Sequence, residues 1–128
     1  MKDKAGLAQV LIETGIVLWR KGEDVQAREP LNAGLALGRA VGEKLGAALA
    51  LNELGNVAFN LCEYAAARAL HEESLSLRHE LGDKLGSATS LGNLGNVAIM
   101  QNDNATARAL HEESLSLRRE LGDKKGIA

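Results

Sequence analysis

The sequence predicts an all-α protein, a right-handed solenoid of three antiparallel helical hairpins. The first observation behind this prediction is an internal repeat, because residues 71–78 return unchanged as residues 111–118. A period of about 40 residues is typical of arrays in which each unit buries its apolar face against its neighbour. The second observation is composition. Hydrophobic residues make up 45% of the chain but aromatic residues only 2%, which favours closely packed helices over a sheet sandwich.

Alignment at this period predicts a single domain, 1–128, with repeat units at about 7–46, 47–86 and 87–126, and with 127–128 as the start of a further unit. The first unit is the most diverged. Pro30 falls inside its second expected helix, where it removes a hydrogen bond and clashes with a preceding carbonyl. We therefore expect a kink near Pro30 and a more mobile first hairpin.

The second unit shows the helical pattern most clearly. Its second half has apolar or small residues at spacings of three and four, which places them on one helix face: Ala67, Leu70, Ser74, Leu77 and Leu81. The first half, from about Leu45 to Leu61, has a similar stripe. Each unit is therefore predicted to be a helical hairpin.

Glycines and short polar residues mark the turns. Gly82 and Gly122 can take the left-handed conformation after a helix, and the following Asp83 and Asp123 can cap the next helix. Gly22 and Asn102 suit the turn inside a hairpin in the same way, and Cys62 occupies this position in the middle unit. We interpret Cys62 as an inert thiol in a turn.

Composition also limits the classes of partner. The chain has 15 Lys and Arg against 17 Asp and Glu, a net charge of −2, with the two signs interspersed. This predicts no nucleic-acid partner and no membrane partner. One cysteine cannot form an internal disulfide, and residues 1–6 lead into no apolar segment, so we expect a cytoplasmic protein without a signal peptide.

Leu54 and Gly55, followed twelve residues after the glycine by Ala67, resemble the tetratricopeptide repeat, in which two helices cross closely at small residues. The period of about 40 residues is longer than the family's common period of about 34. The residue pattern of the repeat resembles that of the long-repeat arrays of Pins-type adaptors and of bacterial signalling and regulatory proteins.

The resemblance implies a concave groove, lined by the first helix of each repeat, that binds a protein or peptide. Carried over by register, its binding residues are Glu13, Trp19, Arg20, Asn52, Asn56, Phe59, Asn60, Asn93, Asn96 and Met100. Amides can donate to and accept from a ligand backbone, and the apolar members would serve as anchors. Two alternatives stay open: the asparagines could bond only neighbouring helices, and Trp19 could belong to the core. A carboxylate clamp does not fit, because Arg20 is the one cation in this set.

Catalytic, cofactor and metal sites are not expected. His71 and His111 are each followed by Glu-Glu-Ser and not by the spacing of a helical zinc motif, and the glycine-rich stretch contains no phosphate-loop lysine. An enzyme would need a convergent set of titratable groups, whereas the expected groove offers mainly amides, Glu13, Glu53 and Arg20.

The sequence therefore predicts a non-catalytic, cofactor-free scaffold. Two alternatives remain. One is self-association as a homo-oligomer, through a C-terminal end where residues 127–128 begin a further unit without a polar capping helix. The other is a ligand-sensing segment of a larger regulator.

Overall fold

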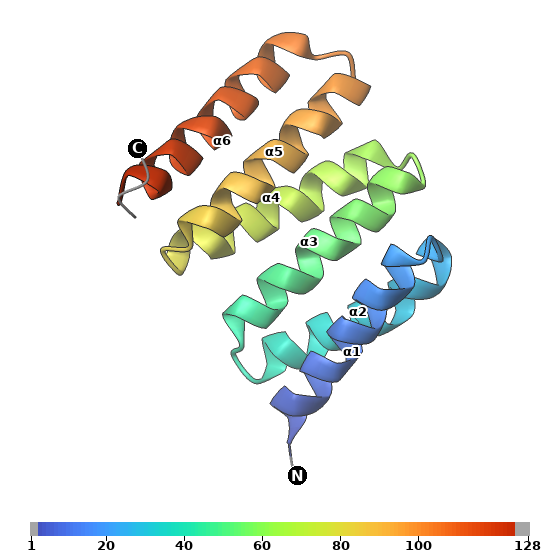
Figure 1. The fold of residues 1–128 in the computed structure, drawn as a ribbon. Helices are drawn as coiled ribbons and strands as arrows, with labels where there is room; N and C mark the ends of the chain where they lie inside the picture. Colours follow the sequence, from blue (N-terminus) through green and yellow to red (C-terminus); the bar gives the residue numbers. More distant parts are fainter. Residues whose placement is uncertain (1–2, 125–128) are drawn as a thin grey trace.

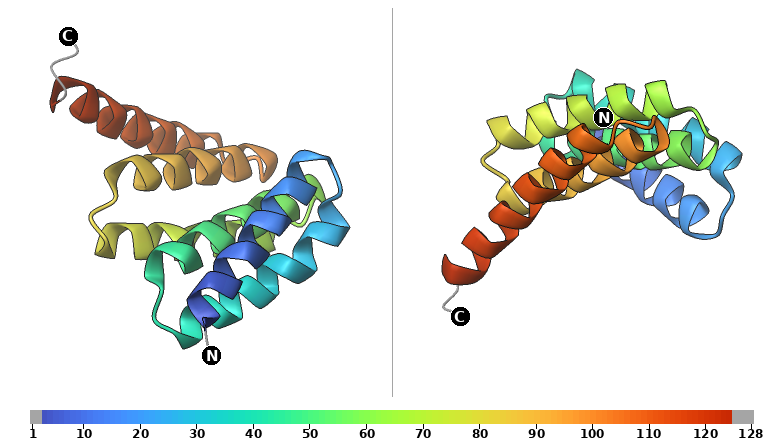
Figure 2. Two further views of the ribbon diagram at one scale, coloured as in Figure 1. Left: turned by 60° about the horizontal axis from the view of Figure 1, so that its bottom comes forward. Right: turned by 90° about the horizontal axis from the view of Figure 1, so that it is seen from above.

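The computed structural model describes residues 3–124, and of residues 123 and 124 only the backbone. The described residues form six helices and no strands: α1 (Lys4–Arg20), α2 (Asp24–Ala40), α3 (Lys44–Asn60), α4 (Tyr64–Glu80), α5 (Lys84–Met100) and α6 (Asn104–Lys124). Consecutive helices pair into three antiparallel hairpins, which stack so that α1 and α6 lie towards opposite ends (Figure 1). Successive hairpins are rotated relative to one another (Figure 2). The predicted all-α solenoid is confirmed.

The helix and turn lengths account for the repeat period. Each of the first five helices has 17 residues, and three residues separate each helix from the next. Two such helices and two such turns make up one period of the repeat. The predicted repeat units start at residues 7, 47 and 87, within the first turn of α1, α3 and α5, because an alignment fixes the period of a repeat but not its phase. The predicted start of a further unit, 127–128, lies outside the described residues.

Every turn uses a positive φ at its second residue. These residues are Gly22, Gly42, Cys62, Gly82 and Asn102, with φ between +63° and +82°. In each turn this residue and the next donate backbone hydrogen bonds to carbonyls of the preceding helix, as Cys62 does to Phe59 (3.0 Å) and Glu63 to Ala58 (2.8 Å). The predicted turns at Gly22, Gly82 and Asn102 are confirmed.

The prediction for Asp83 is confirmed and that for Gly122 is wrong. The Asp83 carboxylate accepts a hydrogen bond from the backbone N–H of Gly86 at 2.9 Å and caps α5. In contrast, α6 continues through Gly122 to Lys124, so the backbone of Asp123 lies inside a helix.

Pro30 lies inside α2, which runs from Asp24 to Ala40 as one element. The expected kink near Pro30 and the expected mobility of the first hairpin remain predictions.

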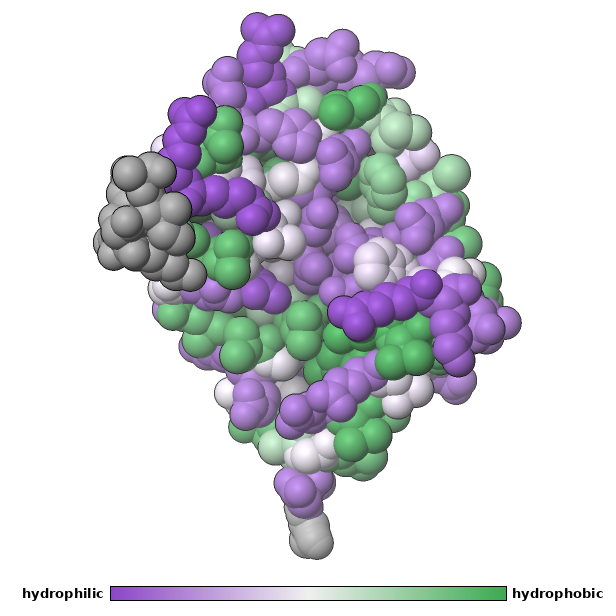
Figure 3. Space-filling model, viewed as in Figure 1, coloured by the Kyte–Doolittle hydropathy of each residue, from purple (hydrophilic) through white to green (hydrophobic). Residues whose placement is uncertain are grey.

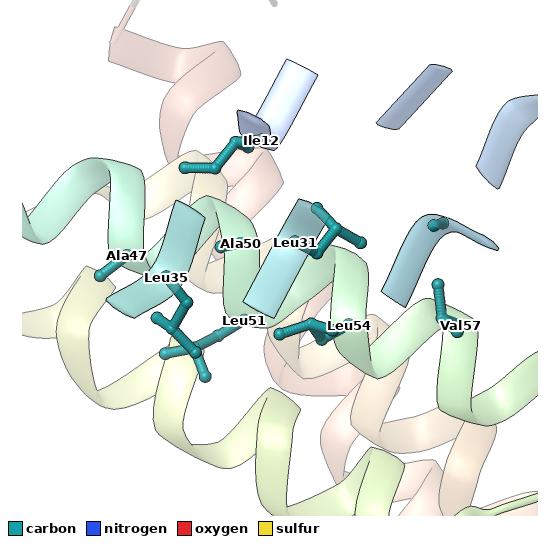
Figure 4. Packing of buried hydrophobic residues seen from close by; sticks show 9 residues of the cluster. Ile12, Leu31, Leu35, Ala47, Ala50, Leu51, Leu54 and Val57 are labelled. Carbon is teal, nitrogen blue, oxygen red and sulfur yellow. The ribbon is translucent and has the colours of Figure 1, made fainter. Parts of the chain in front are cut away.

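The core is built from aliphatic side chains of successive helices. Ile12 of α1, Leu31 and Leu35 of α2, and Leu51 and Leu54 of α3 are at most 7% exposed and pack together (Figure 4). Small residues bring the helices close: the buried hydroxyl of Ser74 donates to the carbonyl of Ala48 at 2.9 Å. Ser114 donates to Ala88 in the next hairpin at 2.7 Å. The second and third hairpins therefore share an equivalent buried hydrogen bond between their two helices.

Candidate partner-binding face

The first helices of the three hairpins, α1, α3 and α5, contact one another in that order (Figure 1). Four positions of each helix, spaced by four, three and four residues, lie along one side, and we call them the first-helix face. They are Gln9, Glu13, Ile16 and Arg20 of α1, Leu49, Glu53, Asn56 and Asn60 of α3, and Thr89, Asn93, Asn96 and Met100 of α5. All except Glu53 are partly or fully exposed.

Polar side chains link α3 to α5 at the centre of this face. The amide of Asn93 donates to the side-chain oxygen of Asn52 at 2.9 Å, and Asn52 donates to Glu53 at 3.4 Å. Asn56 donates to the other oxygen of Glu53 at 3.3 Å. Asn52 and Glu53 are 7% and 9% exposed. This network fixes the relative position of the two helices, because each buried polar group has a partner.

Burial raises the pKa of the Glu53 carboxyl. The amides of Asn56 and Asn52, followed by the charges of Arg20 and Arg78, act in the opposite direction on this pKa because they favour the carboxylate. The side chain is therefore a buried acid held between amide donors on the first-helix face.

The predicted asparagines divide into two groups. In the first group, Asn93 donates to Asn52, and Asn60 donates to Asp24 at the start of α2 at 3.2 Å, so for these three the alternative of a bond to a neighbouring helix is observed. Asn56 and Asn96 form the second group. Asn56 uses its NH₂ group on Glu53, which leaves its carbonyl oxygen for a ligand, and Asn96 is exposed.

The predicted apolar anchors also differ from one another. Trp19 packs against the core cluster of α1, α2 and α3, in agreement with the alternative that it belongs to the core. Phe59 packs beside the Ala58, Ala67 and Val97 cluster, and its ring centroid lies 5.5 Å from that of Tyr64. Met100, in contrast, is 47% exposed on the first-helix face.

The two charged candidates on α1, Glu13 and Arg20, are both exposed. Glu13 accepts a hydrogen bond from Gln9 at 3.2 Å. Arg20 lies near enough to Glu53 for its charge to favour the carboxylate. These two side chains therefore extend the polar centre of the face onto α1.

Sequence reasoning missed two features. Leu45 and Leu85, at the beginning of α3 and α5, are each 55% exposed. The face drawn in Figure 3 has hydrophobic regions beside hydrophilic ones. A cavity of about 530 Å³ lies between α1, α2 and α3, and Gly38 and Glu43 are among its lining residues. The repeat alignment contained a signal for this cavity, because Gly38 is aligned with Arg78 and Arg118, so the first unit lacks a large side chain at this position.

His71, His111 and Cys62 lie apart from this face. His71 is buried against Gly55, and Cys62 is exposed in its turn. In the part of the chain that the structure describes, no three His, Cys, Asp or Glu side chains gather as a metal site would require. Among the helices described, none has the length and apolarity needed to cross a membrane.

A family model described as tetratricopeptide repeat matches residues 46–120. The chain belongs to the tetratricopeptide repeat family. Repeats of this family generally serve as scaffolds for protein interactions, and the match covers the second repeat unit and most of the third.

Two solved structures share this fold. The tetratricopeptide repeat domain of Arabidopsis FLU has a TM-score of 0.86 and 18% identity, over 93% of this chain and 99% of that one. BtubC (BKLC) from P. vanneervenii has a TM-score of 0.83 and 18% identity, over 90% of this chain and 48% of that one. At this identity the two matches show the fold alone. Comparison with curated protein sequences gave no match.

Proposed function

We propose that this tetratricopeptide repeat array is a non-catalytic scaffold that binds an extended or helical peptide segment of another protein along the first-helix face. The observation that carries the proposal is the pairing of accessible amides with apolar side chains. Asn56 and Asn96 lie at equivalent positions of α3 and α5, with Leu49 and Met100 on the same face. Amides can bind a peptide backbone, and aliphatic and methionine side chains can accept its apolar residues.

The polar network supports this use of the face. Asn93, Asn52 and Glu53 are held by hydrogen bonds between α3 and α5, so the amides beside them sit on helices whose relative position is fixed. A preorganised surface loses less conformational entropy when a peptide binds. The parts of the first-helix face on α3 and α5 are therefore preorganised for a ligand.

The test is selection of peptides from a random display library on the 128-residue chain, followed by fluorescence anisotropy with a selected peptide. We expect the double variant Asn56→Ala/Asn96→Ala to weaken binding by about 10-fold or more, since each lost hydrogen bond contributes about 1 kcal/mol. Asn32→Ala, at an exposed asparagine of α2, is the matched control and should bind normally. Equal affinity for the double variant and the control would reject the first-helix face as the binding site.

A second candidate function is head-to-tail association of two copies, because α1 exposes large apolar residues on its outer side. Leu7, Val10 and Val17 are 52%, 57% and 48% exposed. The equivalent positions of α3, which pack against the preceding hairpin, are 3% exposed or less. Light scattering over a concentration series should then show a dimer or larger species that Val10→Lys disperses. A monomer at every concentration would reject this candidate for the chain.

A further inference from the structure

The cavity between the first two hairpins has an occupied counterpart one repeat later. It is lined by Glu13 of α1, Gly38 of α2, and Glu43 and Gly46 at the start of α3. The equivalent residues one repeat period later are Glu53, Arg78, Asp83 and Gly86. The two junctions therefore differ in that the second has an arginine where the first has a glycine.

Arg78 fills the counterpart of the cavity in the second junction. Its guanidinium Nη1 lies 2.7 Å from Oδ2 of Asp83, and its side chain is only 12% exposed. The guanidinium rests directly against the backbone of Gly86, where a Cβ atom would collide with Nη1. Its charge also reaches Glu53. The fold thus holds a guanidinium between two acidic residues and a glycine.

The first junction keeps these surroundings without the arginine. A Cβ atom built on Gly38 would have no neighbour closer than 3.7 Å, and one built on Gly46 none closer than 3.8 Å. The lining residues include the acids Asp3, Glu13 and Glu43 but no Lys or Arg. Among the described residues, Glu13 and Glu43 form no ion pair. The junction therefore combines open space with uncompensated negative charge.

The cavity is also continuous with the first-helix face. Gln9, Glu13 and Leu49 belong both to its lining and to that face. Apolar side chains, including Ala8, Ile12 and Leu45, supply the rest of its wall. Such a wall suits the methylene groups of a long cationic side chain, which bury their stem while the charged head pairs with a carboxylate.

We propose that this cavity binds the side chain of an arginine supplied by the peptide partner, with Glu43 pairing with its guanidinium as Asp83 does with Arg78, and with Glu13 as a second acidic residue in the lining. This inference rests on the proposed function, because the partner's arginine arrives along the first-helix face. It predicts the chemistry of the partner: a peptide with an arginine that reaches the α1–α3 junction.

The first test uses a small probe, so that it does not depend on finding the partner. Nitrogen-15 correlation spectra of the chain are recorded while Nα-acetylarginine amide is added. We expect saturable shifts at the amides of Gly38 and Gly46. Nα-acetylcitrulline amide, which has nearly the same shape but no charge, should leave them unchanged. Equal responses to the two compounds, or no response to either, would overturn the proposal.

The second test introduces an arginine into the chain itself by substitution. Gly38→Arg places the side chain where Arg78 stands in the next repeat, and Gly38→Ala controls for the helix propensity that any side chain adds. We expect Gly38→Arg to have a Tm several degrees above that of Gly38→Ala and to abolish the shifts caused by the arginine compound. Glu43→Gln should remove most of this additional stability. A Gly38→Arg variant no more stable than Gly38→Ala would contradict a guanidinium site.

The two proposals can fail separately. If display selection gives binding peptides but replacement of their arginines by citrulline leaves affinity unchanged, the cavity inference is wrong and the scaffold function stands. If the arginine compound binds at Gly38 and Gly46 but no selected peptide is affected by Asn56→Ala/Asn96→Ala, the pocket stands and the first-helix face does not.

Discussion

The imidazole of His71 lies directly against Gly55, so that a Cβ atom at residue 55 would be 2.5 Å from Nε2. The next hairpin repeats this arrangement, since a Cβ atom at residue 95, also a glycine, would be 2.6 Å from Nε2 of His111. In the first hairpin Leu31 takes the place of the histidine and packs on Gly15. A large side chain of the second helix thus occupies the space that glycine leaves on the first, and this contact sets how closely the two helices approach.

Gly55→Ala should therefore destabilise the fold by about 1–3 kcal/mol, since the added methyl group overpacks a close contact between two helices. Urea unfolding followed by circular dichroism measures the effect. Gly92→Ala in α5 is the control, because a Cβ atom there would meet only Ser114 Oγ, at 3.7 Å. The control should be neutral or stabilising by up to ~1 kcal/mol, as expected for Ala against Gly in a helix. Equal effects of the two substitutions would refute the contact as the cause.

Burial of His71 predicts a loss of stability in mild acid. Burial lowers the pKa of His71 from 6.5 to about 4. As the pH falls below about 6.5, the unfolded chain binds this proton before the folded chain does, so the free energy of unfolding decreases until the pH reaches about 4. The stabilisation is complete above the unfolded-state pKa, and its loss amounts to about 3 kcal/mol over this interval. Denaturation curves between pH 7.5 and 4.5 would measure it.

His71→Leu isolates the contribution of this one histidine. Leucine already occupies the equivalent position in the first hairpin, where Leu31 is fully buried against Gly15. The variant should fold normally and lose most of the pH dependence between 4.5 and 6.5. It should also remove a buried Nδ1 atom for which the described structure gives no hydrogen-bond partner. A pH dependence equal to that of the unaltered chain would assign the effect to other groups.

Cys62→Gly should stabilise the protein by about 1 kcal/mol. Cys62 has φ +63°, in the left-handed region where a side chain is strained and glycine is not. Thermal unfolding compares the variants, and Gly22→Ala is the reciprocal control, because Gly22 has φ +82° at the equivalent turn. The control should lower stability by a similar amount. If Cys62→Gly lowers Tm, the side chain makes a contact that outweighs the backbone strain.

The turns and the hairpins could be predicted from the sequence because they depend on local chemistry. Gly22 and Asn102 are residues that tolerate positive φ, and the repeat period aligns them with Cys62. Gly122 shows the limit of this reasoning. It has the same residue type as Gly82 but lies in a continuous helix, because glycine permits the left-handed conformation without requiring it.

The candidate site was less predictable because the direction of a side chain depends on its neighbours. Register placed Asn52, Asn56, Asn93 and Asn96 on one side of their helices, yet Asn52 is buried and Asn96 exposed. The difference arises because Asn52 packs against α5, where Asn93 donates to it, whereas Asn96 lies on α5 itself, which no further first helix covers among the described residues. The cavity beside Gly38 depends on three helices at once, and a single-helix pattern does not contain that information.

Ser74→Ala should cost about 1–2 kcal/mol of stability, because it removes a buried hydrogen bond between the two helices of the second hairpin. Ser74 is fully buried, and its Oγ lies 2.9 Å from the carbonyl oxygen of Ala48 and 3.5 Å from Oγ of Ser90 in the next hairpin. Ser76→Ala, at an exposed position of the same helix, is the matched control and should change stability by no more than about 0.5 kcal/mol.

Ser114→Ala tests the same bond in the third hairpin, where Ser114 donates to Ala88 at 2.7 Å. Urea unfolding of the three variants gives the comparison. A loss at both buried positions would show that the hydroxyl stabilises the repeat wherever it occurs. A Ser74→Ala variant as stable as Ser76→Ala would mean that close packing at this crossing needs only a small side chain.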